Sequence, residues 1–290
     1  MESFFILRPF NPLFFVLFGC SILILTLTSL LLRKKSEKTR TAVLVTACLV
    51  TFVSFFVYKY FLSLDTEYNQ ILTNQYVMEL TERGMEPAEA ARVAAGKSGF
   101  NWWNELPLHL CNVNMMLIPL AVLTKKRPLM GFCFFLAPLG AMLALIMPSP
   151  GFREGFSILL PRMLGYYFTH FMIVIEGLAI AAFGLYRPKF RDLPKNMLAT
   201  AGLGLGAFLI STVLRLAHLS PDANYFFTYY HEGIPPLEIF FNLIHLPYLY
   251  LIPVVLGMGV YMALITSGFA LAERKSHKPE SEKAGEGSRV

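Results

Sequence analysis

Seven stretches of the chain are long and apolar enough to cross a lipid bilayer, and this pattern restricts the fold more than any other feature. They cover about 11–32, 41–62, 105–123, 129–148, 164–186, 197–217 and 239–269. A transmembrane helix needs about 20 mostly apolar residues to cross about 30 Å of hydrocarbon. Of the 290 residues, 55% are hydrophobic and only 15% are charged, which is a membrane-protein composition. We therefore predict an all-α membrane protein with about seven transmembrane helices.

The basic residues predict the orientation of these helices, because Lys and Arg collect in cytoplasmic loops. Alternate connections hold 17 of the 25 Lys and Arg residues. They are Arg33, Lys34, Lys35, Lys38, Arg40, Lys125, Lys126, Arg127, Arg187, Lys189, Arg191, Lys195, Arg274, Lys275, Lys278, Lys283 and Arg289. We expect the N-terminus outside and the C-terminus inside. The first window lacks a basic start and a small-residue cleavage site, so we expect a retained helix rather than a signal peptide.

The segments outside the windows predict the domain organisation. Residues 1–10 form an outer N-terminal segment, and 11–269 form the seven-helix domain. Within it, 64–100 is an outer insert with helical spacing of its apolar residues. Pro87 and Gly96 mark the start and end of a second short helix in this insert. The tail from 270 to 290 is rich in Lys, Glu, Ser and Gly, so we predict a disordered cytoplasmic segment.

Polar residues are concentrated in the outer halves of the third, fifth, sixth and seventh predicted spans. They are Asn104, Glu105, His109, Cys111, Asn112, Asn114, His170, Arg215, His218, Glu238, Asn242 and His245. Polar groups inside a membrane normally face a cavity or a partner, so each is a candidate for function. Residues three or four apart share a helix face, which places Glu105, His109 and Asn112 on one stripe. Similar stripes through Arg215 and His218 and through Asn242 and His245 predict one polar pocket open to the outer leaflet.

Cys111 is the cysteine nearest to this polar region, since Cys20, Cys48 and Cys133 lie within apolar stretches. His109 is two residues away and would point to another side of a helix. We therefore predict that His170, at similar depth on another helix, is the partner of the thiol. A thiol beside an imidazole can carry acyl transfer through a thioester. The developing oxyanion could be bound by Asn112, Asn114 or Arg215.

Three functions are compatible with these residues. The first is a lipid acyltransferase or esterase with Cys111 and His170 as catalytic residues and no cofactor. Its expected substrate contacts are His109, Asn112, Asn114, Arg215, His218, Asn242 and His245. The second is a zinc-dependent membrane lipid hydrolase that uses the histidines, although no His-x-x-x-His pair is present. The third is a transporter or receptor that binds a small solute in the outer pocket.

The expected partner of the enzyme is a membrane phospholipid or another acyl lipid. We expect no nucleic-acid partner, because no basic patch is interleaved with a stacking surface. The net charge of +6 reflects the Lys and Arg residues in the predicted cytoplasmic loops, and it favours contact with anionic lipid. The sequence does not specify an oligomeric state.

Three motifs resemble a known membrane-protein family. They are Glu105-Leu-Pro-Leu-His109-Leu-Cys111, Tyr166-Tyr167-x-x-His170, and Asn224-Tyr225-Phe226 followed by Pro235. The chain from about 40 to 265 resembles the YwaF-like integral membrane proteins of bacteria. These are related to an animal acyltransferase of ether phospholipids and, more distantly, to androgen-induced membrane ester hydrolases. The resemblance implies a Cys and His catalytic pair at Cys111 and His170, and a location in the bacterial cell membrane.

Overall fold

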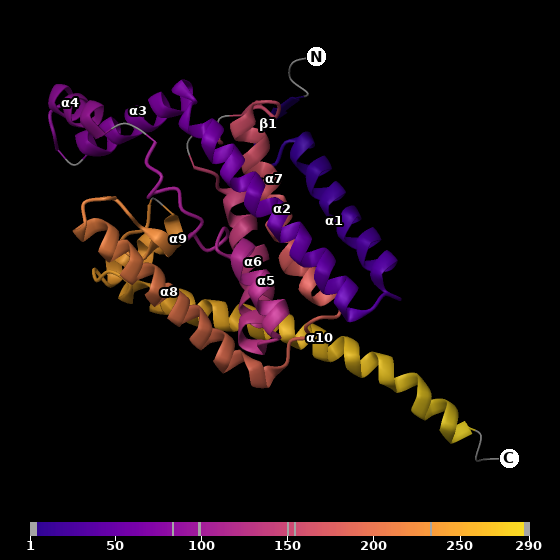
Figure 1. The fold of residues 1–290 in the computed structure, drawn as a ribbon. Helices are drawn as coiled ribbons and strands as arrows, with labels where there is room; N and C mark the ends of the chain where they lie inside the picture. Colours follow the sequence, from indigo (N-terminus) through magenta and orange to yellow (C-terminus); the bar gives the residue numbers. More distant parts are fainter. Residues whose placement is uncertain are drawn as a thin grey trace.

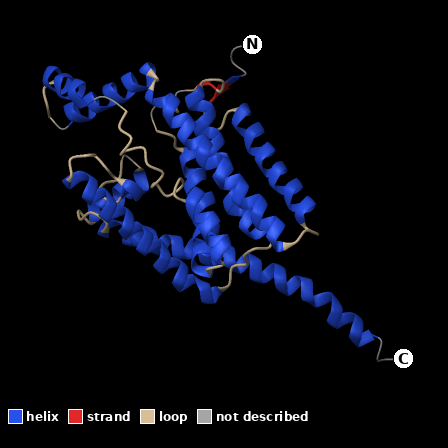
Figure 2. Ribbon diagram, viewed as in Figure 1, coloured by secondary structure: helices blue, strands red, loops and turns tan. Residues whose placement is uncertain are grey.

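The protein is an all-α membrane protein with about seven spans, as predicted. The computed structural model describes residues 5–82, 84–97, 100–149, 151–153, 155–232 and 234–286. Within these residues, six helices are long and apolar enough to cross a membrane, and one shorter apolar helix accompanies them. Helices account for most of the ribbon in Figure 2.

The helices follow the apolar windows closely at five positions. The long helices are α1 (Pro12–Leu32), α2 (Glu37–Ser63), α6 (Arg127–Ile146), α7 (Pro161–Ala182), α8 (Leu193–Leu216) and α10 (Ile252–Glu286). The shorter ones are α3 (Thr66–Glu82), α4 (Pro87–Lys97), α5 (Asn114–Thr124) and α9 (Pro235–Leu243). Three 3₁₀ turns are also present: η2 (Phe190–Asp192), η3 (Tyr225–Phe227) and η4 (Leu249–Leu251).

Helix α7 lies at the centre of the bundle, where it packs against α1, α2, α5 and α6 (Figure 1). Gly177 of α7 faces Ala137 and Pro138 of α6, and a side chain at this glycine would overlap both. The missing side chain therefore lets the two backbones approach closely, as is common between membrane helices. Helices α8 and α10 pack together and join the central group where α8 contacts α6. Inside the bundle, the Thr51 hydroxyl donates a hydrogen bond of 2.5 Å to Glu176.

The outer insert consists of two helices, α3 and α4, that pack against each other (Figure 1). It lies at the same end of the bundle as a two-stranded antiparallel sheet. In that sheet, β1 (Ile6–Leu7) pairs with β2 (Phe156–Ser157). This pairing fixes the N-terminal segment to the loop that precedes α7.

Two predicted spans differ from the structure. The window 105–123 forms a helix only from Asn114 to Thr124, and the residues before it adopt irregular turns. The window 239–269 contains a break: α9 ends at Leu243, and the membrane-crossing helix starts at Leu249. Pro247 lies in this break, where it has no amide hydrogen for a helical bond. The predicted helical stripes at 105–112 and 238–245 therefore do not exist as continuous helix faces.

The described part of the C-terminal segment continues the last membrane helix. Helix α10 continues to Glu286, whereas disorder is predicted from 270 onward. Ala, Glu and Lys are strong helix formers, and they are frequent in this part of the chain. Residues 287–290, at the end of the predicted tail, lie outside the described residues.

Candidate active site

The segment 100–113 places Cys111 among the central helices without forming a helix itself. Side chains instead hold its backbone: the Asn101 carboxamide accepts from the amide of Trp103 at 3.0 Å and donates to the Leu219 carbonyl at 3.0 Å. The Tyr225 hydroxyl donates to the Trp103 carbonyl. The segment is visible in Figure 2 as the tan chain between α4 and α5.

Cys111 and His170 are in direct contact. The Cys111 Sγ lies 3.6 Å from the His170 Nε2, within hydrogen-bond distance for sulfur, and both residues are buried. His170 comes from the middle of α7, one turn after Tyr166. Gly140 of α6 leaves room for this approach, because its side-chain position would meet the Leu110 side chain and the Cys111 amide.

A backbone carbonyl orients the His170 ring. The His170 Nδ1 lies 2.8 Å from the Tyr166 carbonyl oxygen. A carbonyl oxygen can only accept, so the hydrogen of the neutral ring is on Nδ1 and the lone pair of Nε2 faces the thiol. The arrangement leaves His170 able to accept the Cys111 proton.

A row of aromatic rings connects His170 to the outer insert. The Tyr166 ring lies 4.3 Å from the His170 ring, and Phe152 stacks on Tyr166 at 4.3 Å between ring centroids. Tyr68 of α3 contacts Phe152 at 5.4 Å. Burial raises the pKa of Tyr68 above its ordinary value, so its phenol stays protonated. The Tyr166 hydroxyl donates to the Ala144 carbonyl at 2.7 Å, which fixes the middle of the row.

An ion pair lies beside the Cys111–His170 pair. The Lys59 ammonium of α2 contacts the Glu105 carboxylate and sits over the ring of Tyr58 at 5.0 Å. Glu105 belongs to the same segment as Cys111, so the ion pair joins this segment to α2. Sequence reasoning missed Lys59 as a site residue. The signal for this ion pair in the sequence was a lysine near the predicted outer end of an apolar helix, together with an acidic residue at similar depth.

The other predicted site residues fall into three groups. His109, Asn112 and Asn114 lie close to Cys111 in the chain; His109 packs edge-on against Tyr225 at 5.1 Å, and Asn114 donates to the Leu110 carbonyl at 2.7 Å. Asn112 is buried, and its carboxamide oxygen has no partner among the described residues.

Arg215 has a different position from the one expected. Its Nε donates to the Ala223 carbonyl at 2.6 Å, and its guanidinium lies 4.1 Å from the Tyr229 ring. Arg215 therefore holds the loop that follows α8.

His218, Asn242 and His245 are exposed, and none of their described contacts reaches the Cys111–His170 pair. His218 lies beyond the end of α8 with a positive φ of 56°. His245 lies after the end of α9, beside Phe241. The structure does not bring these three residues to the Cys111–His170 pair, since α8 ends before His218 and α9 ends before His245. Their role as substrate contacts stays a prediction.

The metal-binding alternative requires several ligands to converge. The described residues contain no group of three or more His, Cys, Asp and Glu side chains that could hold a metal ion. The zinc-dependent reaction therefore gains no support from the positions of these side chains.

Comparison with known proteins gives one match, and it covers most of the chain. A family model described as the TMEM164 family matches residues 6–266. No curated protein and no solved structure matches. The match is to this family and not to the bacterial YwaF-like group that the motifs resemble. Because the matched region includes all the apolar windows up to α10, the chain belongs to the TMEM164 family of membrane proteins.

Proposed function

We propose that this protein is a membrane-embedded lipid acyltransferase or esterase in which Cys111 is the nucleophile and His170 is its general base. The observation that carries the proposal is the 3.6 Å contact between the Cys111 Sγ and the His170 Nε2. The carbonyl of Tyr166 supports it, because it holds Nδ1 as the donor and leaves Nε2 free to accept a proton. A nucleophile, a base within reach and a group that orients the base form the arrangement that covalent catalysis requires.

The first half of the reaction transfers an acyl group to sulfur. His170 Nε2 takes the proton of the Cys111 thiol, and the thiolate attacks the carbonyl carbon of a lipid ester. The bond between the acyl carbon and the ester oxygen breaks, and the proton on Nε2 passes to that oxygen. The products are a lipid with a free hydroxyl and an acyl thioester on Cys111.

The second half returns the enzyme to its starting state. An acceptor hydroxyl, from a second lipid or from water, gives its proton to Nε2 and attacks the thioester carbonyl. The carbon–sulfur bond breaks, and the sulfur recovers the proton from Nε2. A lipid acceptor makes the protein a transferase, and water makes it an esterase.

Two backbone amides are available to bind the oxyanion. The amides of Cys111 and Asn112 lie close to the Cys111 sulfur. Neither donates to a backbone carbonyl among the described residues, because the segment 100–113 is not helical. Preorganised amides of this kind stabilise negative charge on a carbonyl oxygen. The Asn112 side chain stays a candidate donor, whereas Asn114 and Arg215 already donate to backbone carbonyls.

The motif resemblance supports the same class of reaction. Leu106-Pro-Leu-His-Leu-Cys111 resembles the corresponding segment of the acyltransferase of ether phospholipids. We propose a membrane phospholipid or another acyl lipid as substrate, in keeping with the location of the pair within the bundle. A bacterial cell-membrane location stays a prediction from that resemblance.

The test is to trap the acyl-enzyme. The purified full chain in nanodiscs receives a phospholipid with an isotope-labelled acyl ester, and the intact protein and its peptides are analysed by mass spectrometry. We expect a labelled acyl adduct on Cys111 that neutral hydroxylamine removes. Cys111→Ala should show neither adduct nor turnover, and His170→Ala should form the adduct at least about 100-fold more slowly, the low end of general-base contributions.

Cysteine controls separate a specific adduct from adventitious acylation. Cys20→Ala removes an exposed cysteine of α1, and Cys133→Ala removes a buried cysteine of α6. Both variants should retain the adduct and the turnover. Full turnover by Cys111→Ala would falsify the proposed mechanism. Supplying lysophospholipid as an acceptor then distinguishes the transferase, which makes diacyl product, from the esterase, which releases free fatty acid.

A further inference from the structure

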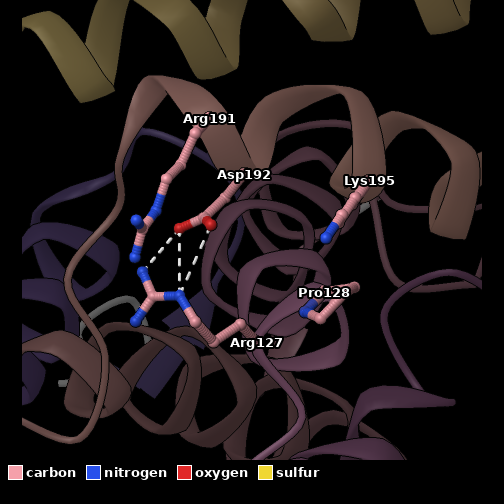
Figure 3. Close-up of a pocket in the computed structure, with 5 residues that line it drawn as sticks. All are labelled: Arg127, Pro128, Arg191, Asp192 and Lys195. Carbon is pink, nitrogen blue, oxygen red and sulfur yellow. Dashed lines mark hydrogen bonds and ion pairs between the residues drawn. The ribbon is translucent and has the colours of Figure 1, made fainter.

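A second candidate site lies at the opposite end of the bundle from the outer insert, where α6 and α8 begin. It is a pocket of about 340 Å³ lined by Arg127, Pro128, Arg191, Asp192 and Lys195 (Figure 3). These residues belong to the basic connections predicted to face the cytoplasm. The pocket has no role in the proposed acyl transfer.

Arg127 and Asp192 form the fixed part of this pocket. The Arg127 Nη2 lies 2.5 Å from the Asp192 Oδ2 and donates to the Arg187 carbonyl at 2.9 Å. The Arg127 guanidinium also lies 5.0 Å from the Tyr186 ring. These contacts join the start of α6 to the turn before α8, so the positions of the pocket walls are well defined.

Arg191 and Lys195 supply positive charge that this pair does not neutralise. Both side chains are exposed, and no carboxylate among the described residues forms an ion pair with either one. Figure 3 shows the Arg191 guanidinium beside the Arg127–Asp192 pair and the Lys195 ammonium directed into the same space. With three cations and one carboxylate, the pocket lining has a net charge of +2. Such a surplus favours an anionic ligand.

The two helix ends add to this preference. The residues at the N-caps of α6 and α8, Lys126 and Asp192, make no side-chain capping hydrogen bond. The first turn of α8 has no acidic residue. A helix N-terminus carries partial positive charge, which favours a phosphate or carboxylate.

The surroundings of the pocket fit a lipid better than a soluble anion. Phe190 precedes Arg191 in the chain and is 53% exposed, and Leu198 follows Lys195 on α8 and is 74% exposed. Exposed apolar side chains of this size beside cations suit a ligand with a charged headgroup and apolar chains. Basic pockets between transmembrane helices at the cytoplasmic side bind phosphate headgroups.

We propose that this pocket binds the phosphate of an anionic phospholipid in the cytoplasmic leaflet, with Arg191 and Lys195 as its main ligands. The acyl chains lie along the apolar surface that Phe190 and Leu198 flank. Arg127 mainly fixes the start of α6 against the turn before α8, because its guanidinium already forms an ion pair with Asp192. The lipid in this pocket is distinct from the substrate at Cys111.

Native mass spectrometry of the full chain can measure this binding directly. The delipidated protein is titrated with phosphatidylglycerol, and with phosphatidylcholine as the zwitterionic comparison. We expect the wild type to retain one phosphatidylglycerol with clear preference over phosphatidylcholine. Arg191→Gln/Lys195→Gln should weaken phosphatidylglycerol binding by on the order of 10- to 30-fold, from the typical contribution of each basic residue near a membrane surface.

A matched variant tests whether the loss of positive charge at any position weakens phosphatidylglycerol binding. Lys34→Gln/Lys35→Gln removes the same charge from exposed positions between α1 and α2, on the same predicted side of the membrane. It should change phosphatidylglycerol binding less than about twofold, since scattered charges act weakly. If both double variants lose binding equally, the pocket is not the site.

Two further measurements keep the outcome clear. The single Lys195→Gln variant changes one exposed side chain, so it tests the pocket even if the double variant folds poorly. Inorganic phosphate is titrated as a competitor: if it binds as tightly as phosphatidylglycerol and displaces it, the ligand is a soluble phosphate and the lipid assignment is overturned. Equal retention of phosphatidylglycerol by the wild type and the pocket variants would also overturn it. Binding is measured without turnover, so neither result depends on the Cys111 mechanism.

Discussion

Gly165 of α7 faces Tyr58 of α2 so closely that a methyl group on the glycine would overlap the Tyr58 side chain. Tyr58 precedes Lys59, and Gly165 precedes Tyr166, so this contact sets the distance between α2 and the part of α7 that carries His170. We predict that Gly165→Ala destabilises the protein by about 1–3 kcal/mol, the usual cost of overpacking. Thermal unfolding in detergent measures this effect.

A second helical glycine provides the control for Gly165. The side-chain position of Gly202 in α8 meets no atom within 4 Å. Gly202→Ala should leave the unfolding temperature unchanged or raise it, because alanine favours a helix more than glycine does. Equal destabilisation by the two variants would show that the Gly165–Tyr58 contact is not the cause.

Arg162 anchors the outer insert to α7. Its guanidinium lies 2.6 Å from Asp65 and 2.7 Å from Glu67, and its side chain is 1% exposed. We predict that Arg162→Gln leaves these carboxylates unpaired and increases hydrogen exchange in α3. Arg153→Gln is the matched control, since Arg153 is exposed and bonds a single carbonyl. Unchanged protection of α3 in Arg162→Gln would contradict the anchoring role.

Lys59 and Glu105 should show strong coupling in a double-mutant cycle. Lys59→Met leaves the Glu105 carboxylate without its partner, and removal of one member of a buried ion pair costs about 3–5 kcal/mol. Because the Glu105 side chain is 21% exposed, we expect the low end of that range. The double variant Lys59→Met/Glu105→Gln should recover at least half of the loss. Additive losses in unfolding free energy would show that the ion pair does not couple the two positions.

Chelation distinguishes the thioester reaction from the zinc-dependent one. A Cys111–His170 mechanism does not need a metal to polarise the ester carbonyl, so we predict that dialysis against a zinc chelator leaves turnover unchanged. The measurement is lipid turnover before and after dialysis, with metal content checked by mass spectrometry. Loss of turnover that zinc restores would favour the hydrolase alternative.

Orientation in the membrane can be tested by labelling introduced cysteines. Asn74 is exposed on α3, and Ser36 caps the start of α2 at the opposite end. On a background without the native cysteines, Asn74→Cys should react with an impermeant maleimide in intact cells. Ser36→Cys should react only after permeabilisation. Labelling of Ser36→Cys in intact cells would reverse the predicted topology.

Hydropathy predicted the long helices well because the length and the apolar content of a membrane span can be read directly from the sequence. It placed α1, α2, α6, α7 and α8 within a few residues. Hydropathy does not report conformation, so the irregular segment before α5 was predicted as helix. Pro107 and the polar residues of 101–114 were visible in the sequence, but their tertiary bonds to residues 219–225 were not.

The pairing of Cys111 with His170 was predicted from their similar depth and from the family resemblance, and the structure places the two side chains 3.6 Å apart. Their catalytic roles stay a prediction. The exposed positions of His218 and His245 could not be predicted, because they depend on where α8 and α9 end. The Lys59–Glu105 pair was missed because its members lie in segments far apart in the sequence, so the contact of Lys59 with the polar residue Glu105 depends on how α2 packs.

The short length of α5 has a consequence for how lipid would reach the thiol. With 11 residues, α5 covers about 16 Å, roughly half of the 30 Å hydrocarbon thickness. Cys111 comes just before the first turn of α5, so the thiol lies about one length of α5 away from Lys125, which is predicted to lie at the cytoplasmic boundary. With the N-terminus outside, as the basic residues predict, an ester carbonyl of the outer leaflet needs only a short inward displacement, whereas one from the inner leaflet must move by most of the length of α5. A lipid synthesised on the cytoplasmic face would therefore require transbilayer movement, and scramblase or flippase activity would control the supply of substrate for the proposed acyl transfer.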